Sequence, residues 1–475
     1  MSGISAKERK HRLESDNPWW RKPGEIEGKD YTRRVYFPPF YELVRMTELN
    51  RAIVLMGPRR VGKTVMSHQA IANLTEEGVN PKHILYVPLD RDAYSRMSLE
   101  SILLAFLELN RVPKGERVYA FFDEIQYLEK WEVHLKSLVD TYPQHRFVAT
   151  GSAAAALKIK STESGAGRFT DFTLPPLTFY EYMEFTDNKH LFGNPESPVS
   201  AGKAMVNIDR INEHFVEYIN SGGYPETVLS DGVRKRHDHF IKSDVVEKVL
   251  EKDLPTLFGI SNTSELKRLL TTIAHHTGQE INMNRLSKDA EVTRTTIYKY
   301  LEYLEAAFLI RRVRRVDRNI KRFKRDHTFK VYLTNPSMYA ALFGAADREN
   351  GTLLGRLVET AVFSHLFNII RKLEGPYYAR WNDGEVDLVA MDITGIKAKA
   401  AIEIKWSDIP NEDLSEIKGL SDFAVKNNLD GEAGRVVCLT KKDLVFKPYG
   451  NGMIGFMPAS LFCLKLLEFN GMKIF

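Results

Sequence analysis

The first residues with the types and spacing for chemistry are glycines, a lysine and a threonine in one short loop. The stretch from Gly57 to Thr64 reads Gly-Pro-Arg-Arg-Val-Gly-Lys-Thr, the spacing G-x4-G-K-T. An apolar run over 52–56 precedes this loop and a helical pattern follows it, which is the setting of a phosphate-binding P-loop. The glycines let the backbone curl until successive N–H groups point at phosphate oxygens near a helix N-terminus. The sequence therefore predicts a nucleoside triphosphate site.

The positions of this loop have distinct expected roles. Lys63 would reach the β- and γ-phosphates, and the Thr64 hydroxyl would be a Mg²⁺ ligand. The expected cofactors are ATP and Mg²⁺. The residues expected to contact the nucleotide are Gly57, Pro58, Arg59, Arg60, Val61, Gly62, Lys63 and Thr64.

Two carboxylates follow a later apolar run, Tyr-Ala-Phe-Phe over 119–122. They would lie at the carboxyl end of a buried strand, where open α/β sheets bind their ligands. Asp123 would hold the Mg²⁺ shell, and Glu124 would polarise the attacking water. The next strand ends in Thr150-Gly-Ser152. Ser152 would contact the γ-phosphate or the water, or it would only cap the following helix, and both interpretations stay open.

A second set of carboxylates lies near the end of the chain. Asp387 follows Asp-Gly-Glu-Val, and Glu403 and Lys405 form a Glu-Ile-Lys step on a predicted strand, where residues two apart share one face. With Glu359 from a predicted helix, this set collects three carboxylates and one ammonium. Asp387 and Glu403 would hold Mg²⁺ or Mn²⁺, and Lys405 would position or deprotonate a water for attack on a phosphodiester.

Between these two sets lies a segment typical of DNA binding. Two predicted helices, 284–290 and 293–305, are joined by a short turn, as in a helix-turn-helix. The following residues 311–330 hold ten Lys or Arg and two Asp, a local charge of +8 in a chain of net charge +5. Alternating apolar and basic residues there predict a β-wing. The expected DNA contacts are Arg294, Thr295, Tyr298, Lys299, Arg311, Arg312, Arg314, Arg315 and Arg318. The alternative is a protein-docking winged helix with a solvated basic edge.

Short strand-like runs alternate with helical patterns over 46–190, which predicts an α/β domain with a parallel sheet. The strings GPRRVGKT, FFDEIQ, ATGSAAA, GRFTDFTLPPLTFYEY and SGGYPE resemble those of a prokaryotic family of AAA+ superfamily ATPases with a C-terminal nuclease-like domain of uncharacterised function. The resemblance implies an AAA+ fold and self-assembly into a ring, with a hexamer expected. It also makes Arg168 the candidate for an arginine finger supplied to a neighbouring copy, with a purely structural role as the alternative.

The C-terminal set resembles the PD-(D/E)XK nuclease fold, and the helix with Glu359 is similar to that of archaeal Holliday-junction resolvases. Proteins of this fold also bind DNA without cutting it, and a different fold with a coincidental motif is a further alternative. The expected division is an N-terminal arm (1–45), an α/β AAA+ ATPase core with a parallel sheet (46–190), a helical lid (191–261), a winged helix (262–345) and an α/β PD-(D/E)XK nuclease-like domain (346–475).

Composition narrows the class of protein. An apolar content of 43% and a charged content of 27% are those of an ordinary globular protein. No apolar run is long enough to span a bilayer, so we expect a cytoplasmic protein without a membrane partner. The two cysteines, Cys438 and Cys463, predict neither a disulfide framework nor a zinc site.

These features favour an ATP-driven protein that remodels or translocates on DNA, duplex or branched, with the nuclease-like domain contacting a further strand. A different class is an ATP-dependent oligomerisation switch of the defence or signalling type, with the C-terminal domain as its effector. A remodeller directed only at proteins would leave the basic segment 311–330 unexplained unless its client is acidic.

Overall fold

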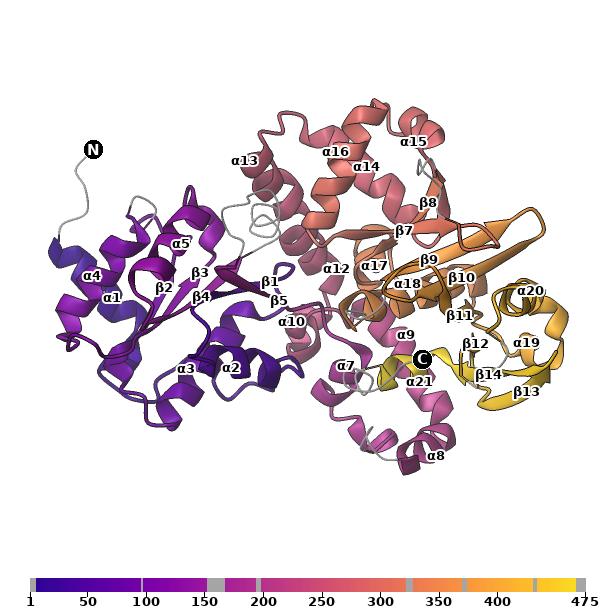
Figure 1. Ribbon diagram of the computed structural model, residues 1–475, viewed down its shortest axis with the longest axis horizontal. Helices are drawn as coiled ribbons and strands as arrows, with labels where there is room; N and C mark the ends of the chain where they lie inside the picture. Colours follow the sequence, from indigo (N-terminus) through magenta and orange to yellow (C-terminus); the bar gives the residue numbers. More distant parts are fainter. Residues whose placement is uncertain are drawn as a thin grey trace. The chain divides into compact units, whose positions relative to one another are not determined.

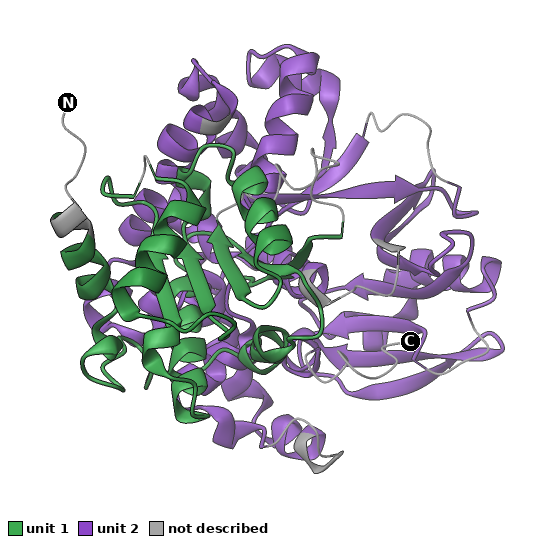
Figure 2. Cartoon of the chain, turned by 60° about the vertical axis from the view of Figure 1, so that its left-hand side comes forward, with its two compact units in different colours: residues 1–175 green, residues 176–475 purple. Residues whose placement is uncertain are grey.

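The computed structural model describes residues 6–94, 97–151, 167–193, 198–321, 328–369, 374–429 and 434–466. Ser152 lies outside these residues. The chain divides into two compact units, residues 1–175 and 176–475 (Figure 2). Each unit is built on one β-sheet. The finer division into five domains stays a prediction.

The first unit contains a parallel five-stranded sheet, in the order β2-β3-β4-β1-β5 (Figure 1). Its strands are β1 (Ala52–Met56), β2 (Ile84–Pro88), β3 (Tyr119–Asp123), β4 (Arg146–Gly151) and β5 (Phe169–Thr173). All residues of β1 to β4 are buried, as expected for a parallel sheet covered on both faces. The predicted parallel sheet is thus confirmed, and β4 lies between the strand that leads into Gly57 and the strand that ends at Asp123.

Helices surround this sheet. They are α1 (Ala6–Asp16), α2 (Phe37–Arg45), α3 (Lys63–Glu76), α4 (Leu99–Asn110) and α5 (Trp131–Thr141). The N-terminal residues pack on the edge strand β2. Asn17 bonds both backbone groups of Tyr86, at 2.7 and 2.9 Å, and the indole N–H groups of Trp19 and Trp20 donate to the carbonyl of Ile84. The arm therefore satisfies backbone groups that an edge strand leaves unpaired.

The second unit contains a mixed nine-stranded sheet, in the order β13-β14-β12-β11-β10-β9-β7-β8-β6. Its strands are β6 (Glu280–Asn282), β7 (Ile310–Val316), β8 (Thr328–Leu333), β9 (Glu374–Trp381), β10 (Gly384–Met391), β11 (Ala398–Ile404), β12 (Val436–Thr440), β13 (Val445–Tyr449) and β14 (Gly452–Pro458). The β11-β12, β12-β14 and β7-β9 pairs are parallel, and the other pairs are antiparallel.

The helices of the second unit precede, interrupt and cover this sheet. They are α7 (Phe179–Phe185), α8 (Pro198–Val206), α9 (Ile208–Ser221), α10 (Pro225–Leu229), α11 (Asp231–Arg234), α12 (His237–Phe240), α13 (Leu254–Phe258), α14 (Thr263–His275), α15 (Met283–Asp289), α16 (Arg294–Ala306), α17 (Ser337–Phe343), α18 (Gly351–Ile369), α19 (Ile409–Glu412), α20 (Lys418–Lys426) and α21 (Ala459–Lys465). Two π-helical stretches, Ile241–Glu247 and Val249–Asp253, lie between α12 and α13. No helix among the described residues is long and apolar enough to cross a membrane.

The helices predicted over 284–290 and 293–305 are confirmed within one residue as α15 and α16, and the alternating apolar and basic residues that follow form the strand β7. What the sequence does not predict is the partner of β7 on its other side. Arg314 pairs with Tyr377, Arg315 with Tyr378 and Val316 with Ala379, so the β7-β8 hairpin continues into the C-terminal strands as one sheet. The order of elements is that of a winged helix, an assignment that stays a prediction.

A buried histidine fastens α18 to the start of α7. Nε2 of His365 accepts a hydrogen bond from the backbone N–H of Phe179 at 2.8 Å, and Nδ1 lies 2.7 Å from the carbonyl oxygen of Ala361. This pattern requires the neutral tautomer with its proton on Nδ1. Burial lowers the pKa of His365 from 6.5 to about 4.

We expect His365 to make the second unit sensitive to acid. Because its pKa is lower in the folded state, its contribution to stability is complete above about pH 6.5 and is lost as the pH falls towards 4. The shift corresponds to about 3 kcal/mol. In His365→Gln, which cannot titrate, the free energy of unfolding measured with urea should therefore fall less than in the wild type between pH 7 and pH 4. The exposed His239→Gln is the matched control, and parallel profiles for wild type and His365→Gln would contradict the assignment.

Candidate nucleotide site and carboxylate cluster

The loop from Gly57 to Thr64 connects β1 to α3, as its spacing predicts. A Cβ on Gly57 would overlap the carbonyl oxygen of Leu174, which follows the neighbouring strand β5. Gly62 precedes α3 with φ of +96°, a left-handed conformation that glycine adopts without strain. The two glycines thus have separate purposes, one for close approach of the backbone and one for the turn into the helix.

Arg34 holds this loop from the N-terminal arm. Its buried guanidinium donates to the carbonyl of Val61 at 2.7 Å and to that of Pro175 at 2.9 Å. The sequence of the N-terminal arm predicts no chemistry, so the role of Arg34 is not among the predictions. No pattern around this residue identifies it, because its partners are backbone carbonyls far away in the chain.

The side chains at the end of the loop point into the site. The ammonium of Lys63 donates to the carbonyls of Gly57 and Pro58, at 3.0 and 2.8 Å, and is held within the curl of the loop. The hydroxyl of Thr64 donates to Oδ2 of Asp123 at 2.9 Å. The two predicted Mg²⁺ ligands of this site are therefore neighbours.

Asp123 receives two further hydroxyl groups. Tyr86, on β2, donates to Oδ2 at 2.7 Å, and Thr150, on β4, donates to Oδ1. Thr150 also accepts a hydrogen bond from the backbone N–H of Glu124 at 3.0 Å. Glu124 has φ of +53° and its carboxylate accepts a hydrogen bond from Gln126. Among the described residues, Thr150 is thus the residue of β4 whose hydroxyl group contacts the acidic pair at the end of β3.

Sequence reasoning misses Tyr86, although a weak signal exists. Tyr86 pairs with Phe121 in the parallel register, and residues two apart on a strand share a face, so its ring lies diagonal to Asp123. Burial and then the carboxylate of Asp123 raise the pKa of Tyr86 well above its usual range, so the phenol stays a donor.

Arg168 lies at the start of β5, far from the P-loop of its own chain. Its carbonyl accepts a hydrogen bond from the N–H of Ala52 at 2.9 Å, and its guanidinium is paired with Asp140. Ala52 begins the strand that leads to the loop, so roughly 15 Å of strand separates Arg168 from Gly57. Arg168 therefore does not reach its own nucleotide site, and a role towards a neighbouring copy stays a prediction.

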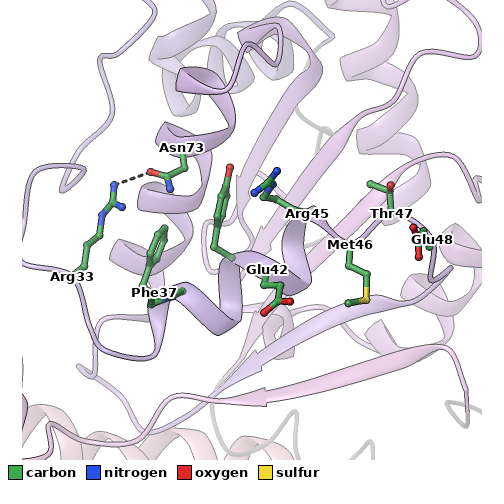
Figure 3. A pocket seen from close by; sticks show the side chains of 10 residues that line it. Arg33, Phe37, Glu42, Arg45, Met46, Thr47, Glu48 and Asn73 are labelled. Atoms are coloured by element: carbon green, nitrogen blue, oxygen red, sulfur yellow. Dashed lines mark hydrogen bonds between the residues drawn. The ribbon is translucent and has the colours of Figure 1, made fainter. Parts of the chain in front are cut away.

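A separate cavity of about 570 Å³ lies beside α2 and α3 (Figure 3). The stacked rings of Phe37 and Tyr41 form part of its lining, together with Arg33, Arg45 and Asn73. Asn73 is ten residues beyond Lys63 on the same helix, or roughly 15 Å along its axis. This distance separates the cavity from the phosphate loop.

The four C-terminal residues predicted to act together are close neighbours. Glu359 comes from α18, Asp387 from β10, and Glu403 and Lys405 from β11. The antiparallel register pairs Leu388 with Ile402, which brings Asp387 opposite Glu403. Lys405 lies 3.1 Å from Oε1 of Glu403, and the backbone N–H of Ile404 donates to Oδ2 of Asp387 at 3.0 Å.

A fifth residue, Lys330 on β8, lies among these carboxylates. Its Nζ atom is 3.1 Å from Glu359, 2.9 Å from Glu385 and 3.0 Å from Asp387. Tyr332, two residues along the same strand, donates to Glu359 at 2.6 Å. In the sequence, Lys330 is only the last of the ten basic residues of 311–330, and no separate role is predicted for it. Its position between Phe329 and Val331, on an otherwise apolar strand, is the sequence feature that indicates burial.

Burial and neighbouring charges shift the acidity of this cluster. Burial, and secondly the charge of Asp387, raises the pKa of Glu403 to about 8. Burial also raises the pKa of Glu359 to about 7, although Lys330 opposes it. Burial lowers the pKa of Lys330, but the carboxylates of Glu359, Asp387 and Glu385 outweigh it, so that pKa lies well above its usual value.

One carboxylate oxygen of the cluster has no partner among the described residues. It is Oε2 of Glu403, which is buried and belongs to the residue opposite Asp387. A cation beside these two carboxylates would satisfy that oxygen. Within the described residues, and with Lys330 in its place among Glu359, Glu385 and Asp387, no three His, Cys, Asp or Glu side chains are arranged to hold a metal ion. Glu359 bonds to Lys330 and Tyr332 instead.

The helix α16 presents the four side chains predicted to face DNA. Arg294, Thr295, Tyr298 and Lys299 are exposed, while Ile297 and Leu301 are buried beneath them. The helix begins at Arg294 after Thr293, whose side chain accepts a hydrogen bond from the N–H of Thr296. Two cations, a threonine and an aromatic ring therefore lie on one solvent-facing surface.

Most of the predicted arginines in and just after β7 have acidic or carbonyl partners within the protein. Two guanidinium N–H groups of Arg312 donate to Oε2 of Glu305, and Arg311 donates to the carbonyl of the same residue. Arg315 donates to the carbonyl of Arg380, and Arg318 lies 4.0 Å from Asp422 and over the ring of Trp381. Arg314 is exposed. The formal charge of the segment thus overstates the positive charge that it presents to solvent.

Two family models match separate parts of the chain. Residues 212–349 match a family described as a domain of unknown function, DUF8612. Residues 49–183 match a family described as AAA domain, and this range contains the P-loop, Asp123 and the five strands of the parallel sheet. This segment is therefore similar to AAA domains. It supplies every described residue of the candidate nucleotide site except the supporting Arg34.

Relatives of similar length are uncharacterized proteins. One, from Haemophilus influenzae, is 24% identical over 383 residues, covering 79% of this chain and 89% of the relative. Another, from Methanocaldococcus jannaschii, is 24% identical over 331 residues, covering 67% of this chain and 68% of the relative. Two solved structures are similar at 12% identity. AMPPCP-bound DnaA from Aquifex aeolicus matches over 59% of this chain and 92% of that chain, with a TM-score of 0.25. Cdc6p from Pyrobaculum aerophilum matches over 73% of this chain and 98% of that chain, with a TM-score of 0.27. These scores carry no argument about function.

We expect Arg34→Ala to weaken the AAA domain at its phosphate loop. The substitution leaves the carbonyls of Val61 and Pro175 without their buried donor, a loss of roughly 2 to 4 kcal/mol. The thermal midpoint should fall, and binding of a fluorescent adenine nucleotide should weaken at least tenfold. Arg33→Ala, next in the chain but exposed, is the matched control. Equal behaviour of the two variants would contradict a role for Arg34 in shaping the loop.

Proposed function

We propose that the chain is an ATP-hydrolysing AAA+ protein that binds DNA and remodels it or translocates along it. The observation that carries the ATPase part is the position of Asp123, whose carboxylate accepts hydrogen bonds from Thr64, Tyr86 and Thr150 at the carboxyl edge of the parallel sheet. The match of residues 49–183 to the AAA domain family supports the same activity.

The residues of the site have roles that follow from their chemistry. Lys63 would exchange its loop carbonyls for the β- and γ-phosphate oxygens of ATP. Thr64 and Asp123 would hold Mg²⁺, which when bound offsets the negative charge of the phosphates. Glu124 would orient and polarise the attacking water. Arg168 would complete the site of a neighbouring copy in a ring, for which we propose a hexamer.

The DNA-binding part of the proposal is supported by the exposed face of α16. Helices α15 and α16 followed by the β7-β8 hairpin have the order of a winged helix, whose second helix enters the major groove. The cations Arg294 and Lys299 would contact phosphates, which supplies affinity with little sequence specificity. Duplex or branched DNA is therefore the proposed partner.

We propose further that the C-terminal cluster is a PD-(D/E)XK-like site, either cutting DNA or only binding it. Asp387 and Glu403 would hold a divalent ion, and Lys405 would orient the attacking water. The unpartnered, buried oxygen of Glu403 supports a cation at this point.

DNA should stimulate ATP hydrolysis by this protein. We would measure the rate without nucleic acid and with linear duplex, single strand and four-way junction, at two salt concentrations, while following labelled DNA for cleavage. Stimulation should be strongest on the junction and should weaken at high salt.

Lys63→Ala should abolish hydrolysis. The double variant Arg294→Ala/Lys299→Ala should lower DNA affinity. The slope of the logarithm of the binding constant against the logarithm of salt concentration should fall by an amount that corresponds to about two phosphate contacts.

The matched control for the α16 variant is Lys397→Ala/Lys399→Ala, which removes two exposed cations from another surface of the same unit. This control should bind DNA as the wild type does. A rate that no DNA changes would contradict the remodelling function. It would favour the nucleotide switch instead, which should hydrolyse slowly and change its assembly state between ATP and ADP.

Tyr86 should support hydrolysis by positioning Asp123. In Tyr86→Phe, the carboxylate keeps Thr64 and Thr150 but loses a charge-assisted hydrogen bond, worth roughly 1.5 to 3 kcal/mol. We expect kcat to fall by about tenfold or more, with the Mg²⁺ concentration for half-maximal rate rising, whereas nucleotide binding without Mg²⁺ should not change.

The control for Tyr86 is Tyr94→Phe. The Tyr94 hydroxyl also donates to a carboxylate, that of Asp16 at 2.6 Å, but this pair does not include Asp123. A Tyr86→Phe enzyme with unchanged kcat and unchanged Mg²⁺ dependence would show that this hydrogen bond does not position the carboxylate for hydrolysis.

A further inference from the structure

Lys330 is the most deeply buried cation of the C-terminal cluster. Its side chain is 5% exposed, and its Nζ atom lies within 3.1 Å of oxygens from Glu359, Glu385 and Asp387. An ammonium has three N–H donors and no acceptor. The three carboxylates therefore use all of its hydrogen-bonding capacity, as the oxygen ligands of a small metal ion would.

The position of Lys330 is unusual for an ordinary ion pair. β8 and β10 are separated by β7 and β9 in the sheet, so a flat sheet would hold their backbones roughly 14 Å apart. The long lysine side chain and the twist of the sheet bring Nζ to Asp387. The ring of Tyr378, on the intervening β9, lies 5.5 Å from Nζ and lines the path of the side chain.

The charges explain why a cation is needed at this point. Glu359 and Asp387 are largely buried, with side-chain exposures of 13% and 11%, and Glu385 is 34% exposed. Buried carboxylates that share one site repel each other unless a cation lies between them. Lys330 supplies that charge from within the chain, and Arg380 adds a weaker contact to Glu385 at 3.7 Å.

A second cation position lies on the other side of Asp387. There Oε2 of Glu403 is buried without a hydrogen-bond partner among the described residues, while Oε1 is paired with Lys405. The cluster thus has two places where positive charge is favoured. One of them is occupied by Lys330, and the other offers carboxylate oxygens of Asp387 and Glu403.

We propose that Lys330 is a tethered cation that takes the place of one divalent ion in the cluster, so that the site accepts a single ion, at Asp387 and Glu403. The inference deepens the proposed metal-binding function and rests on it for the remaining position. It predicts that removing the ammonium opens a second position formed by Glu359, Glu385 and Asp387.

The test is a count of bound Mn²⁺ by electron paramagnetic resonance on the full chain without nucleotide. All proteins carry Asp123→Asn, which removes the acidic metal ligand of the P-loop site. The parent should bind one Mn²⁺, and Lys330→Met should bind two. Lys330→Met/Glu359→Gln should return to one, because the new position loses a ligand. Lys405→Met is the matched control, since Lys405 contacts Glu403 and should not create the second position.

Stability gives an independent measurement. Without metal, Lys330→Met should unfold at a lower urea concentration than the parent, because three carboxylates lose their shared cation. Saturating Mn²⁺ should raise its midpoint more than that of the parent, since an ion that binds only the folded state stabilises it. If Lys330→Met folds poorly without metal, its rise in midpoint with Mn²⁺ is compared with that of the double variant with Glu359→Gln. A larger rise in Lys330→Met supports the second position, and equal rises contradict it.

The outcomes separate this inference from the proposed function. If the parent and Lys330→Met each bind one Mn²⁺, the role of Lys330 is wrong and the Asp387/Glu403 site stands. If the parent binds none and Lys330→Met binds one, Lys330 does replace an ion, and metal-dependent cleavage by the natural protein is wrong. If the parent already binds two, or if neither protein binds any, the inference is overturned.

Discussion

The parallel pairing of β7 with β9 is the contact on which the arrangement of the second unit depends. It joins the β7-β8 hairpin to the C-terminal strands in one nine-stranded sheet. Without this pairing, β8 and β10 would not belong to one sheet, and Lys330 on β8 would not be held close to Asp387. The same pairing makes the surface of α16 and the carboxylate cluster parts of one framework, because α16 packs against β7 and the cluster lies on β10 and β11. A DNA contacted by the helix would therefore meet the cluster at a set distance.

In the first unit, the corresponding constraint is the insertion of β4 between β3 and β1. This order brings the hydroxyl of Thr150 to the carboxylate of Asp123 and to the N–H of Glu124 at once. Tyr86 approaches Asp123 from β2 on the other side. The acidic residue is thus oriented by both neighbouring strands, and the N-terminal arm contributes by holding β2 through Asn17 and the P-loop through Arg34. Such support keeps a charged group in one geometry where a surface carboxylate would rotate freely.

Much of the local structure is predictable because local patterns decide it. The apolar runs of β1 to β4 and the 3.6-residue spacing in α16 identify those elements to within one or two residues. The run Phe-Thr-Asp-Phe-Thr of β5 is weaker, because polar residues interrupt it, and its position beside β1 follows from pairing with that strand. The four-residue C-terminal set is predictable as a cluster because strand alternation and antiparallel register are short-range rules.

The sequence by itself determined the chemistry available: a phosphate loop, an acidic pair after a buried strand, and carboxylates with a lysine on one strand face. Only the tertiary structure decided which cations serve which carboxylates. Lys330 appears in the sequence as one of ten basic residues in a segment of charge +8, yet it is buried among three carboxylates, while Arg312 is paired with Glu305. The number of charged residues follows from composition alone. Which charged side chains become partners depends on strand order and sheet twist, and these are set by residues that lie far apart in the chain.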